Sequence, residues 1–92
     1  MDILHQDDSK KGMFYVVKDD KTLAEMTYVW AGTNQIIIDH TAVDSSLSGK
    51  GVGKQLVVKA VDFARSKGIK IIPLCPFAKS VFQKITEFND VL

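Results

Sequence analysis

The segment from Ser45 to Lys54 constrains this chain most, because glycines alternate along it and a helical pattern begins at its end. The glycines are Gly49, Gly51 and Gly53. They leave backbone N–H groups uncovered by side chains where a helix N-terminus supplies partial positive charge. Lys50 and Lys54 add full charges beside these amides. The segment therefore predicts a cradle for a phosphate or pyrophosphate group.

Composition limits the class of protein. The 92 residues predict one domain over residues 1–92, and 46% hydrophobic with 25% charged residues is ordinary for a globular chain. A net charge of +1 and a single arginine, Arg65, argue against a nucleic-acid-binding module. The one cysteine, Cys75, has no internal disulfide partner, and no stretch approaches the roughly 20 apolar residues of a membrane span. Because the N-terminus also lacks a secretory pattern, we expect a soluble, cytoplasmic protein without a nucleic-acid or membrane partner.

Hydrophobic patterning predicts elements in the order β-β-β-α-β-α. Strands are expected over residues 13–17, 22–30 and 35–43, the last with the solid apolar run of a strand covered on both faces. Apolar residues then recur at helical spacing from Val52, and Gly68 ends that helix. A short strand over 70–74 and a helix opened by Pro76 follow. A strand, a crossover helix and a further strand imply a parallel pair, so the fold class is α+β with a mixed sheet packed by helices.

Two common phosphate-binding motifs do not fit the glycine spacing. A Walker loop needs Gly, four residues and then Gly-Lys-Ser/Thr, but counting back from Gly53 places Ser48 first and Gln55 last. A dinucleotide fingerprint that starts at Gly49 would need a third glycine where Lys54 stands. The spacing therefore argues against a nucleotide triphosphatase and against a two-halved dinucleotide fold.

The stretch from Ile38 to Leu56 resembles the acetyl-coenzyme A segment of the GNAT N-acetyltransferases, where a strand ends in an Arg/Gln-x-x-Gly-x-Gly/Ala loop that opens a helix. Gly51 and Gly53 fall on the motif glycines, and Ser48 stands where Arg or Gln is usual. Downstream, residues 72–78 read Ile-Pro-Leu-Cys-Pro-Phe-Ala, which narrows the resemblance to small GNAT-like proteins that lack the flanking elements of full-size relatives. The resemblance covers most of the chain from residue 14 onward. It implies a minimal GNAT fold with acetyl-CoA as cosubstrate.

The resemblance also implies roles for the residues around the loop. Backbone groups of Thr41, Ala42 and Val43 would pair with the pantetheine arm like an added strand, and the N–H near Val43 would polarise the thioester carbonyl. Lys79 and Lys84 are more distant candidates for contacting phosphates than the two lysines of the loop. The pyrophosphate would be held by the cofactor-binding segment Ser48, Gly49, Lys50, Gly51, Val52, Gly53 and Lys54. The alternative is that the glycines only permit a tight strand-to-helix turn.

His40 and Cys75 are the candidate catalytic residues. His40 lies near the C-terminal end of the expected central strand, where ligands of open sheets collect, and imidazole takes a proton from an amine near neutral pH. Cys75 follows the neighbouring strand and is a candidate acid for the departing coenzyme thiolate or an acyl-accepting nucleophile. A structural role stays open for both residues, since a hydrogen-bonded histidine and a small buried thiol are common.

The remaining polar side chains are weaker candidates. His5 is expected to be exposed in a mobile N-terminal segment. Glu25 and Asp39 could act as bases but lie within expected strands, while Tyr28 and Trp30 belong to the core or its rim. No His/Cys cluster has the spacing of metal ligands, so no metal site is predicted.

The predicted function is acetyl transfer from acetyl-CoA to an unidentified amine. The alternative is a non-catalytic (acetyl-)CoA-binding or sensor protein, which the small size favours because larger relatives build the acceptor pocket from additional elements. A third class is an interaction module in which the glycines merely turn the chain. An exposed edge strand expected near Met13 makes a monomer or a weak homodimer the expected state.

Overall fold

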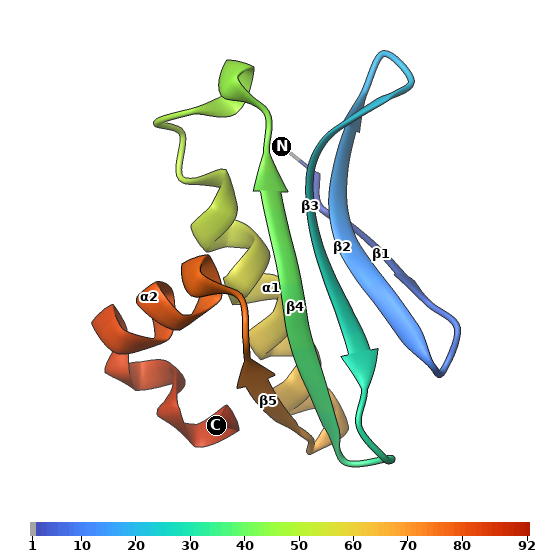
Figure 1. Cartoon of the computed structure of the whole chain (residues 1–92), viewed down its shortest axis with the longest axis vertical. Coiled ribbons are helices and arrows are strands. Elements are labelled where there is room, and N and C mark those ends of the chain that lie inside the picture. The colour runs from blue at the N-terminus through green and yellow to red at the C-terminus, as the bar shows by residue number, and fades with distance from the viewer. Residues whose placement is uncertain (1) are drawn as a thin grey trace.

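A five-stranded sheet in the order β1-β2-β3-β4-β5 organises the chain in the computed structural model, which describes residues 2–92 (Figure 1). The strands are β1 (Leu4–Asp7), β2 (Lys11–Lys18), β3 (Lys21–Trp30), β4 (Gln35–Val43) and β5 (Lys70–Pro73). Neighbours pair antiparallel except β4 and β5, which are parallel. The predicted mixed α+β fold is confirmed, and the expected elements appear in the predicted order.

The helical elements are η1 (Ser45–Leu47), α1 (Val52–Lys67), α2 (Pro76–Lys84) and η2 (Thr86–Val91). Gly68 ends α1 in the left-handed conformation, with its N–H on the last carbonyls of the helix, as glycine at this position favours. At the other end of the chain, η2 is fastened to α1 because the Arg65 guanidinium donates to both carboxylate oxygens of Asp90 at 2.8 and 3.0 Å. The C-terminal tail therefore docks against the helices.

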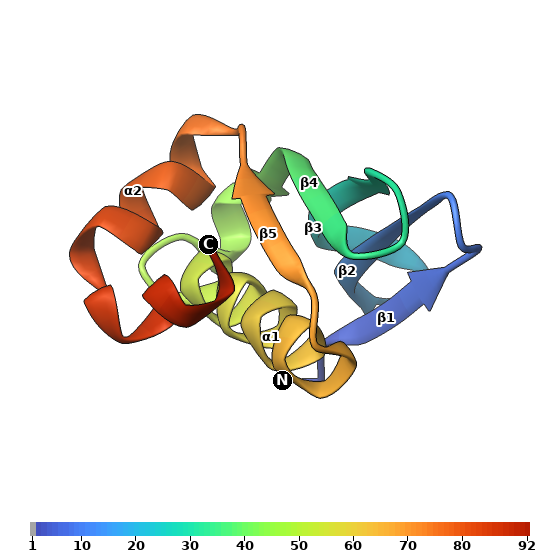
Figure 2. The same ribbon diagram turned by 90° about the horizontal axis from the view of Figure 1, so that it is seen from below.

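Helix α1 covers one face of the curved sheet, and α2 lies beyond the β5 edge, so that the opposite face of β1–β4 carries no helix within residues 2–92 (Figure 2). Burial follows this division along β3. Alternate side chains such as Met26 and Tyr28 are buried under α1, whereas Glu25 and Thr27, on either side of Met26, stay half-exposed. We call the side without a helix the uncovered face.

The edge strand β1 was not predicted from the sequence. It pairs with β2, so Met13 lies in an inner strand, and the expectation of an exposed edge near Met13 is wrong. His5 also lies in this paired strand, not in a mobile segment: its Nε2 is 2.7 Å from the Tyr28 hydroxyl and its ring stacks on Phe14 at 4.2 Å. Asp7 fastens the same strand by accepting from the Tyr28 hydroxyl and from Trp30 Nε1.

A β-bulge in β4 reverses which side chains face α1. Tyr28 is opposite Ile38 but Thr27 is opposite His40, so Asp39 is an extra residue in the ladder. Before the bulge, Ile38 is buried on the α1 side. Strict alternation would turn His40 the same way, yet the inserted residue places His40 beside Thr27 on the uncovered face. The Thr27 hydroxyl donates to the Asp39 carboxylate at 2.6 Å, which anchors the bulge.

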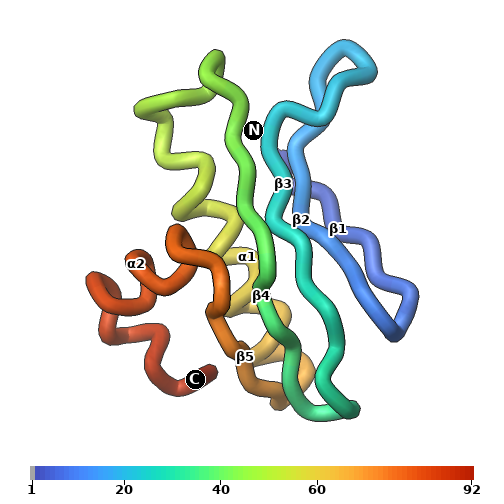
Figure 3. Tube along the Cα trace, viewed as in Figure 1, coloured from blue at the N-terminus to red at the C-terminus, as the bar shows by residue number. Residues whose placement is uncertain are grey.

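Strand β4 continues well past the end of β5 (Figure 3). The parallel pairing stops at Ile38 opposite Pro73, and the amides of Leu74 and Cys75 both donate to the Ile38 carbonyl, at 2.9 and 3.1 Å. The chain then turns away into α2. As a result, residues 40–43 of β4 pair with β3 on one side, and the stretch from 39 to 43 has an open edge on the other.

Candidate active site

The glycine segment forms an irregular turn between η1 and α1. Asp44 opens η1 by accepting from the Ser46 amide at 2.9 Å, and hydrogen bonds from the side chain and the amide of Ser46 hold the pKa of the Asp44 carboxyl below its ordinary value. Gly49 and Gly51 then adopt φ values of +78° and +71°, a region that favours glycine. A Cβ at either position would meet no atom within 4 Å. The backbone is therefore accessible where the sequence predicts an anion cradle.

The amides of this segment divide into used and unused donors. Ser48 N–H donates to the Ser45 carbonyl at 3.1 Å, and Lys50 N–H donates to the Leu47 carbonyl at 3.3 Å. Within residues 2–92, the neighbouring amides without an acceptor are those of Gly49, Gly51, Val52, Gly53 and Lys54. Most belong to the first turn of α1, where unsatisfied N–H groups and the helix dipole together attract anions.

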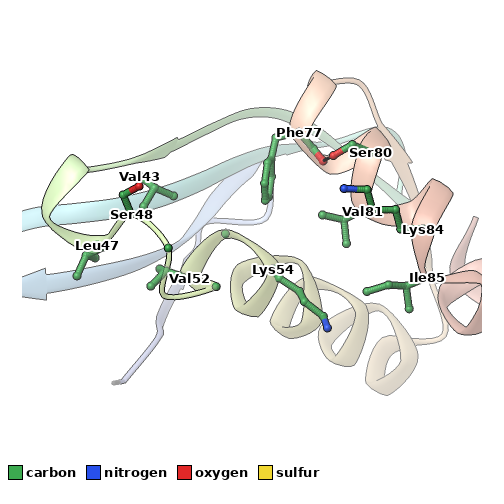
Figure 4. Close-up of a pocket in the computed structure, with 13 residues that line it drawn as sticks. Val43, Leu47, Ser48, Val52, Lys54, Phe77, Ser80, Val81, Lys84 and Ile85 are labelled. Atoms are coloured by element: carbon green, nitrogen blue, oxygen red, sulfur yellow. Dashed lines mark hydrogen bonds between the residues drawn. The ribbon is translucent and has the colours of Figure 1, made fainter.

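A cavity of about 540 Å³ opens beside these amides (Figure 4). Its lining comes from the end of β4, the glycine segment and α2: Val43, Leu47, Ser48, Gly49, Gly51, Val52, Gly53, Lys54, Phe77, Ser80, Val81, Lys84 and Ile85. In Figure 4 the apolar side chains from α2 face the start of α1 across the cavity. One part of the wall is thus apolar, and the other presents amides and two ammonium groups.

The contribution of α2 to this cavity was not predicted. The apolar stripe of the helix indicated only a core face, yet Phe77 is 40% exposed and covers the first turn of α1. Gly53 makes this contact feasible, because a Cβ on Gly53 would lie 2.5 Å from Cζ of Phe77. Lys84, a distant candidate in the sequence, lines the cavity, whereas Lys79 lines a different hollow with Gln83.

The open edge of β4 carries its own backbone donors and acceptors. Asp44 N–H donates to the Leu23 carbonyl at 2.7 Å, which fixes the alternation of the β3–β4 ladder. Counting back from Asp44, the N–H and C=O groups of Ala42 point toward β3, and those of Val43 and Thr41 point to the open edge. These two residues present main-chain groups where an extended ligand can add as a strand.

Cys75 and His40 lie in different surroundings. Cys75 is buried and precedes α2 as its N-cap, with Sγ accepting from the Ala78 amide at 3.2 Å and lying 3.2 Å from the Thr41 hydroxyl. His40 is exposed on the uncovered face. Within residues 2–92, no hydrogen bond joins the two, so the side chain that meets the thiol is Thr41.

The described residues were also compared with the patterns of metal sites and of membrane-spanning helices. Residues 2–92 contain no group of three His, Cys, Asp or Glu side chains suited to holding a metal ion. Across the same residues, no helix has both the length and the apolar composition to cross a bilayer.

The mixed sheet opens between β4 and β5, and at that open edge the glycine segment leads into α1. A family model described as GCN5-related N-acetyl-transferase matches residues 13–91. The chain therefore belongs to the GCN5-related N-acetyltransferase family.

Solved structures agree with this assignment. A GCN5-like putative N-acetyltransferase from Staphylococcus aureus is 39% identical, with a TM-score of 0.74 over 98% of this chain and 85% of that chain. A ribosomal-protein-alanine N-acetyltransferase from Brucella melitensis shares the fold at 17% identity and a TM-score of 0.68, over 85% of this chain and 62% of that chain. An aminoglycoside N-acetyltransferase solved in complex with CoA shares it at 15% identity and a TM-score of 0.60, over 85% of this chain and 67% of that one. A search of curated protein sequences found no match.

Proposed function

We propose that this chain is an N-acetyltransferase of minimal type that moves an acetyl group from acetyl-CoA to an amine. One observation carries the proposal: the open backbone edge at residues 39–43 of β4 leads into the 540 Å³ cavity beside the unused amides of α1. A ligand with an extended arm and a pyrophosphate would match these two surfaces: the arm would pair with the open edge of β4, and the pyrophosphate would bind the unused amides. Acetyl-CoA has both, and it supplies an acetyl group activated as a thioester.

The pyrophosphate end would be held by amides and lysines. The unused N–H groups of Gly49 and of the first turn of α1 are the donors. Lys54 and Lys84, which both line the cavity, supply positive charge for the phosphates. Lys50 lies on the same turn outside the cavity lining, so its part is long-range attraction. The family motif has an Arg or Gln at position 48, whose side chain would contact the phosphates. Because this chain has Ser48 there, backbone amides would make most of the phosphate contacts.

The reacting end would lie along the open edge of β4. Thr41 and Val43 would pair with the pantetheine arm through their main-chain groups, and Ala42 keeps the strand in register with β3. Val43 N–H would donate to the thioester oxygen and stabilise the negative charge that forms when the amine attacks. His40 would take the proton of the amine. Cys75 would protonate the departing sulfur or, in the covalent variant, accept the acetyl group itself.

Binding is tested by titrating the chain with acetyl-CoA while recording amide chemical shifts. We expect the largest changes over residues 41–54. Absence of binding at millimolar acetyl-CoA would contradict both the transferase and the sensor reading. Binding without acetylation of any amine in a mixed panel would favour the sensor. The N-cap role of Cys75 is consistent with a sensor, because it gives the thiol a structural function.

The oxyanion role of Val43 is tested by Val43→Pro, which removes one N–H. This N–H points to the open edge, so proline there costs no ladder hydrogen bond. We expect kcat to fall by about 100-fold while acetyl-CoA still binds. Ala42→Pro is the matched control, since the amide of Ala42 faces β3 and its loss should lower stability. An unchanged kcat in Val43→Pro would remove this donor from the mechanism.

A further inference from the structure

Another cavity lies far from the coenzyme site, and we call it the His5 cavity. It measures about 460 Å³, within the range of small-molecule sites, and its lining includes His5, Trp30, Phe63 and Lys67. Figure 1 shows the turn after β3 and the end of α1 at the opposite end of the sheet from the glycine segment. Lys67 and Gly53, which lines the coenzyme cavity, are about 20 Å apart along α1 at 1.5 Å per residue.

A chain of hydrogen bonds fixes which ring nitrogen of His5 carries the hydrogen. The buried Tyr28 hydroxyl has one hydrogen, and it donates this hydrogen to the ionised Asp7 carboxylate, which can only accept. Burial and the hydrogen bond to Asp7 raise the pKa of Tyr28, so the hydroxyl keeps its hydrogen at neutral pH. Nε2 of His5, 2.7 Å from the same hydroxyl, is therefore the donor of their hydrogen bond. Because burial lowers the pKa of His5, the ring is neutral at pH 7 and Nδ1 is an acceptor.

Two polar groups of this lining have no partner among residues 2–92. Nδ1 of His5 accepts no hydrogen bond there, and the Lys67 ammonium forms neither a hydrogen bond nor an ion pair. Asp7, by contrast, is engaged by the Tyr28 hydroxyl, the Trp30 indole and an amide. The cavity thus offers a ligand one acceptor and one positive charge. A carboxylate suits this charge better than a phosphate dianion, because the carbonyl end of α1 lies beside Lys67 and disfavours excess negative charge.

Aromatic side chains supply the apolar part of the wall. The rings of Trp30 and Phe63 meet at 72° with their centroids 6.1 Å apart, and His5 meets Phe63 at 76° and 4.6 Å. These edge-to-face contacts join β1, β3 and α1, so the rings hold one another in place before any ligand arrives. Trp30 and Phe63 are only half-buried, which leaves ring surface for contact with a planar ligand.

We propose that the His5 cavity binds a small aromatic carboxylic acid that also carries a hydroxyl group, with Lys67 as counter-ion and Nδ1 of His5 as hydrogen-bond acceptor. The ring of the ligand would contact Trp30 and Phe63. This site is independent of the proposed acetyl transfer. Because it lies about 20 Å along α1 from the coenzyme cavity, its ligand would be a second ligand and not the acetyl acceptor.

The binding test uses para-hydroxyphenylacetate as the probe. Phenylacetate lacks its hydroxyl, and tyrosol keeps the phenol but lacks the charge. Trp30 is the only tryptophan of the chain, so its fluorescence and the NMR signal of its Nε1–H report on this cavity. We expect the probe to bind about fivefold more tightly than phenylacetate and about threefold more tightly than tyrosol. No change of the Trp30 signals at millimolar probe, or equal affinity for the three compounds, would overturn the proposal.

Two variants assign these preferences to the two polar groups. His5→Phe keeps a ring that can stack on Phe14 but removes Nδ1, so the preference for the hydroxyl should vanish while the preference for the charge remains. Lys67→Gln should have the reverse effect. Lys59→Gln removes a charge from α1 outside the cavity lining and should leave all three affinities unchanged. Both preferences persisting in His5→Phe and Lys67→Gln would refute the assignment, whichever of the two variants is the more stable.

The outcome is separable from that of the proposed function. Shifts over residues 41–54 on adding the probe, without a change of the Trp30 signals, would place the probe in the coenzyme cavity and would overturn the second site. Binding of acetyl-CoA should be the same in the wild type and in Lys67→Gln. A chain that fails to bind acetyl-CoA but binds the probe with the expected preferences would support the second site and contradict only the acetyl transfer.

Discussion

Replacing Gly53 with alanine separates the shape of the coenzyme cavity from the stability of the fold. Gly53 is the second residue of α1, and a Cβ there would lie 2.5 Å from Cζ and 2.8 Å from Cε2 of Phe77. Carbon atoms in contact need about 3.5–4.0 Å, so the two groups must separate by roughly 1 Å or more. Phe77 is 40% exposed, and its ring therefore moves more easily than the packed helix backbone.

Two terms of opposite sign act on the free energy of unfolding. Alanine is favoured over glycine within a helix by up to about 1 kcal/mol. A phenyl ring displaced from its preferred rotamer costs about 0.5–1.5 kcal/mol. These terms nearly cancel, so we expect Gly53→Ala to change stability by less than about 1 kcal/mol. Binding has no such compensation, because Phe77 forms a wall of the cavity, and we expect the affinity for acetyl-CoA to fall about tenfold, or 1.4 kcal/mol.

Urea denaturation and titration calorimetry with acetyl-CoA measure these two quantities. Gly68→Ala is the matched control: its Cβ meets no atom within 4 Å but its φ is +66°, so it should cost about 1–2 kcal/mol of stability and leave affinity unchanged. In a Phe77→Leu background, the shorter side chain should reduce the loss of affinity caused by Gly53→Ala. A folded Gly53→Ala variant that binds acetyl-CoA as tightly as the wild type would refute the reasoning.

Three further predictions concern the fold around the site. Gly12→Ala should lower the free energy of unfolding by about 1–3 kcal/mol in urea denaturation, because its Cβ would overlap the ring of Tyr28 and the backbone of β1; unchanged stability would contradict this packing. Acidification should loosen β1 in two stages seen by hydrogen exchange. Burial lowers the pKa of His5, so the stability that neutral His5 contributes is complete above pH 6.5 and is lost below it. Burial acts to raise the pKa of Asp7, but hydrogen bonds from the Tyr28 hydroxyl, the Trp30 indole and the Ser9 amide outweigh it and lower this pKa. The stability that ionised Asp7 contributes is therefore lost as the pH falls below 3.8. Finally, Cys75→Ala should cost about 1 kcal/mol by uncapping α2, and Cys75→Ser should restore stability but not any chemistry of the thiol; equal stability of the two variants would contradict the cap.

The sequence predicts the elements well because their patterns are local. The apolar run of β4 and the helical spacing that ends at Gly68 are both visible within a few residues. Strand β1 has no such pattern: all of its side chains are exposed, and it is held by Tyr28 and Trp30, more than 20 residues away. Long-range contacts of this kind leave no trace in a short window of sequence.

In the candidate site, too, local features could be predicted from the sequence and features set by long-range packing could not. The anion cradle is predictable because glycine spacing and a helix start lie next to each other in the chain. The face on which His40 lies is not, since a single inserted residue at Asp39 decides it and alternation read from Ile38 points to the wrong side. The wall built by Phe77 is likewise set by how α2 packs on α1, and the sequence indicated only that the residue is apolar.

The bulge at Asp39 gives strand β4 two chemically distinct sides. After Asp39, alternate residues of β4 serve opposite faces: Thr41 contacts the buried thiol on the α1 side, while His40 and Ala42 lie on the uncovered face. Under the proposed acetyl transfer, a coenzyme on the α1 side would meet amides and lysines, and an amine on the other side would meet His40. Under that proposal, Lys54 and Lys84 would attract the phosphates of the coenzyme, and the bulge would keep His40 on the opposite side of the same strand, where it can take the proton of the amine.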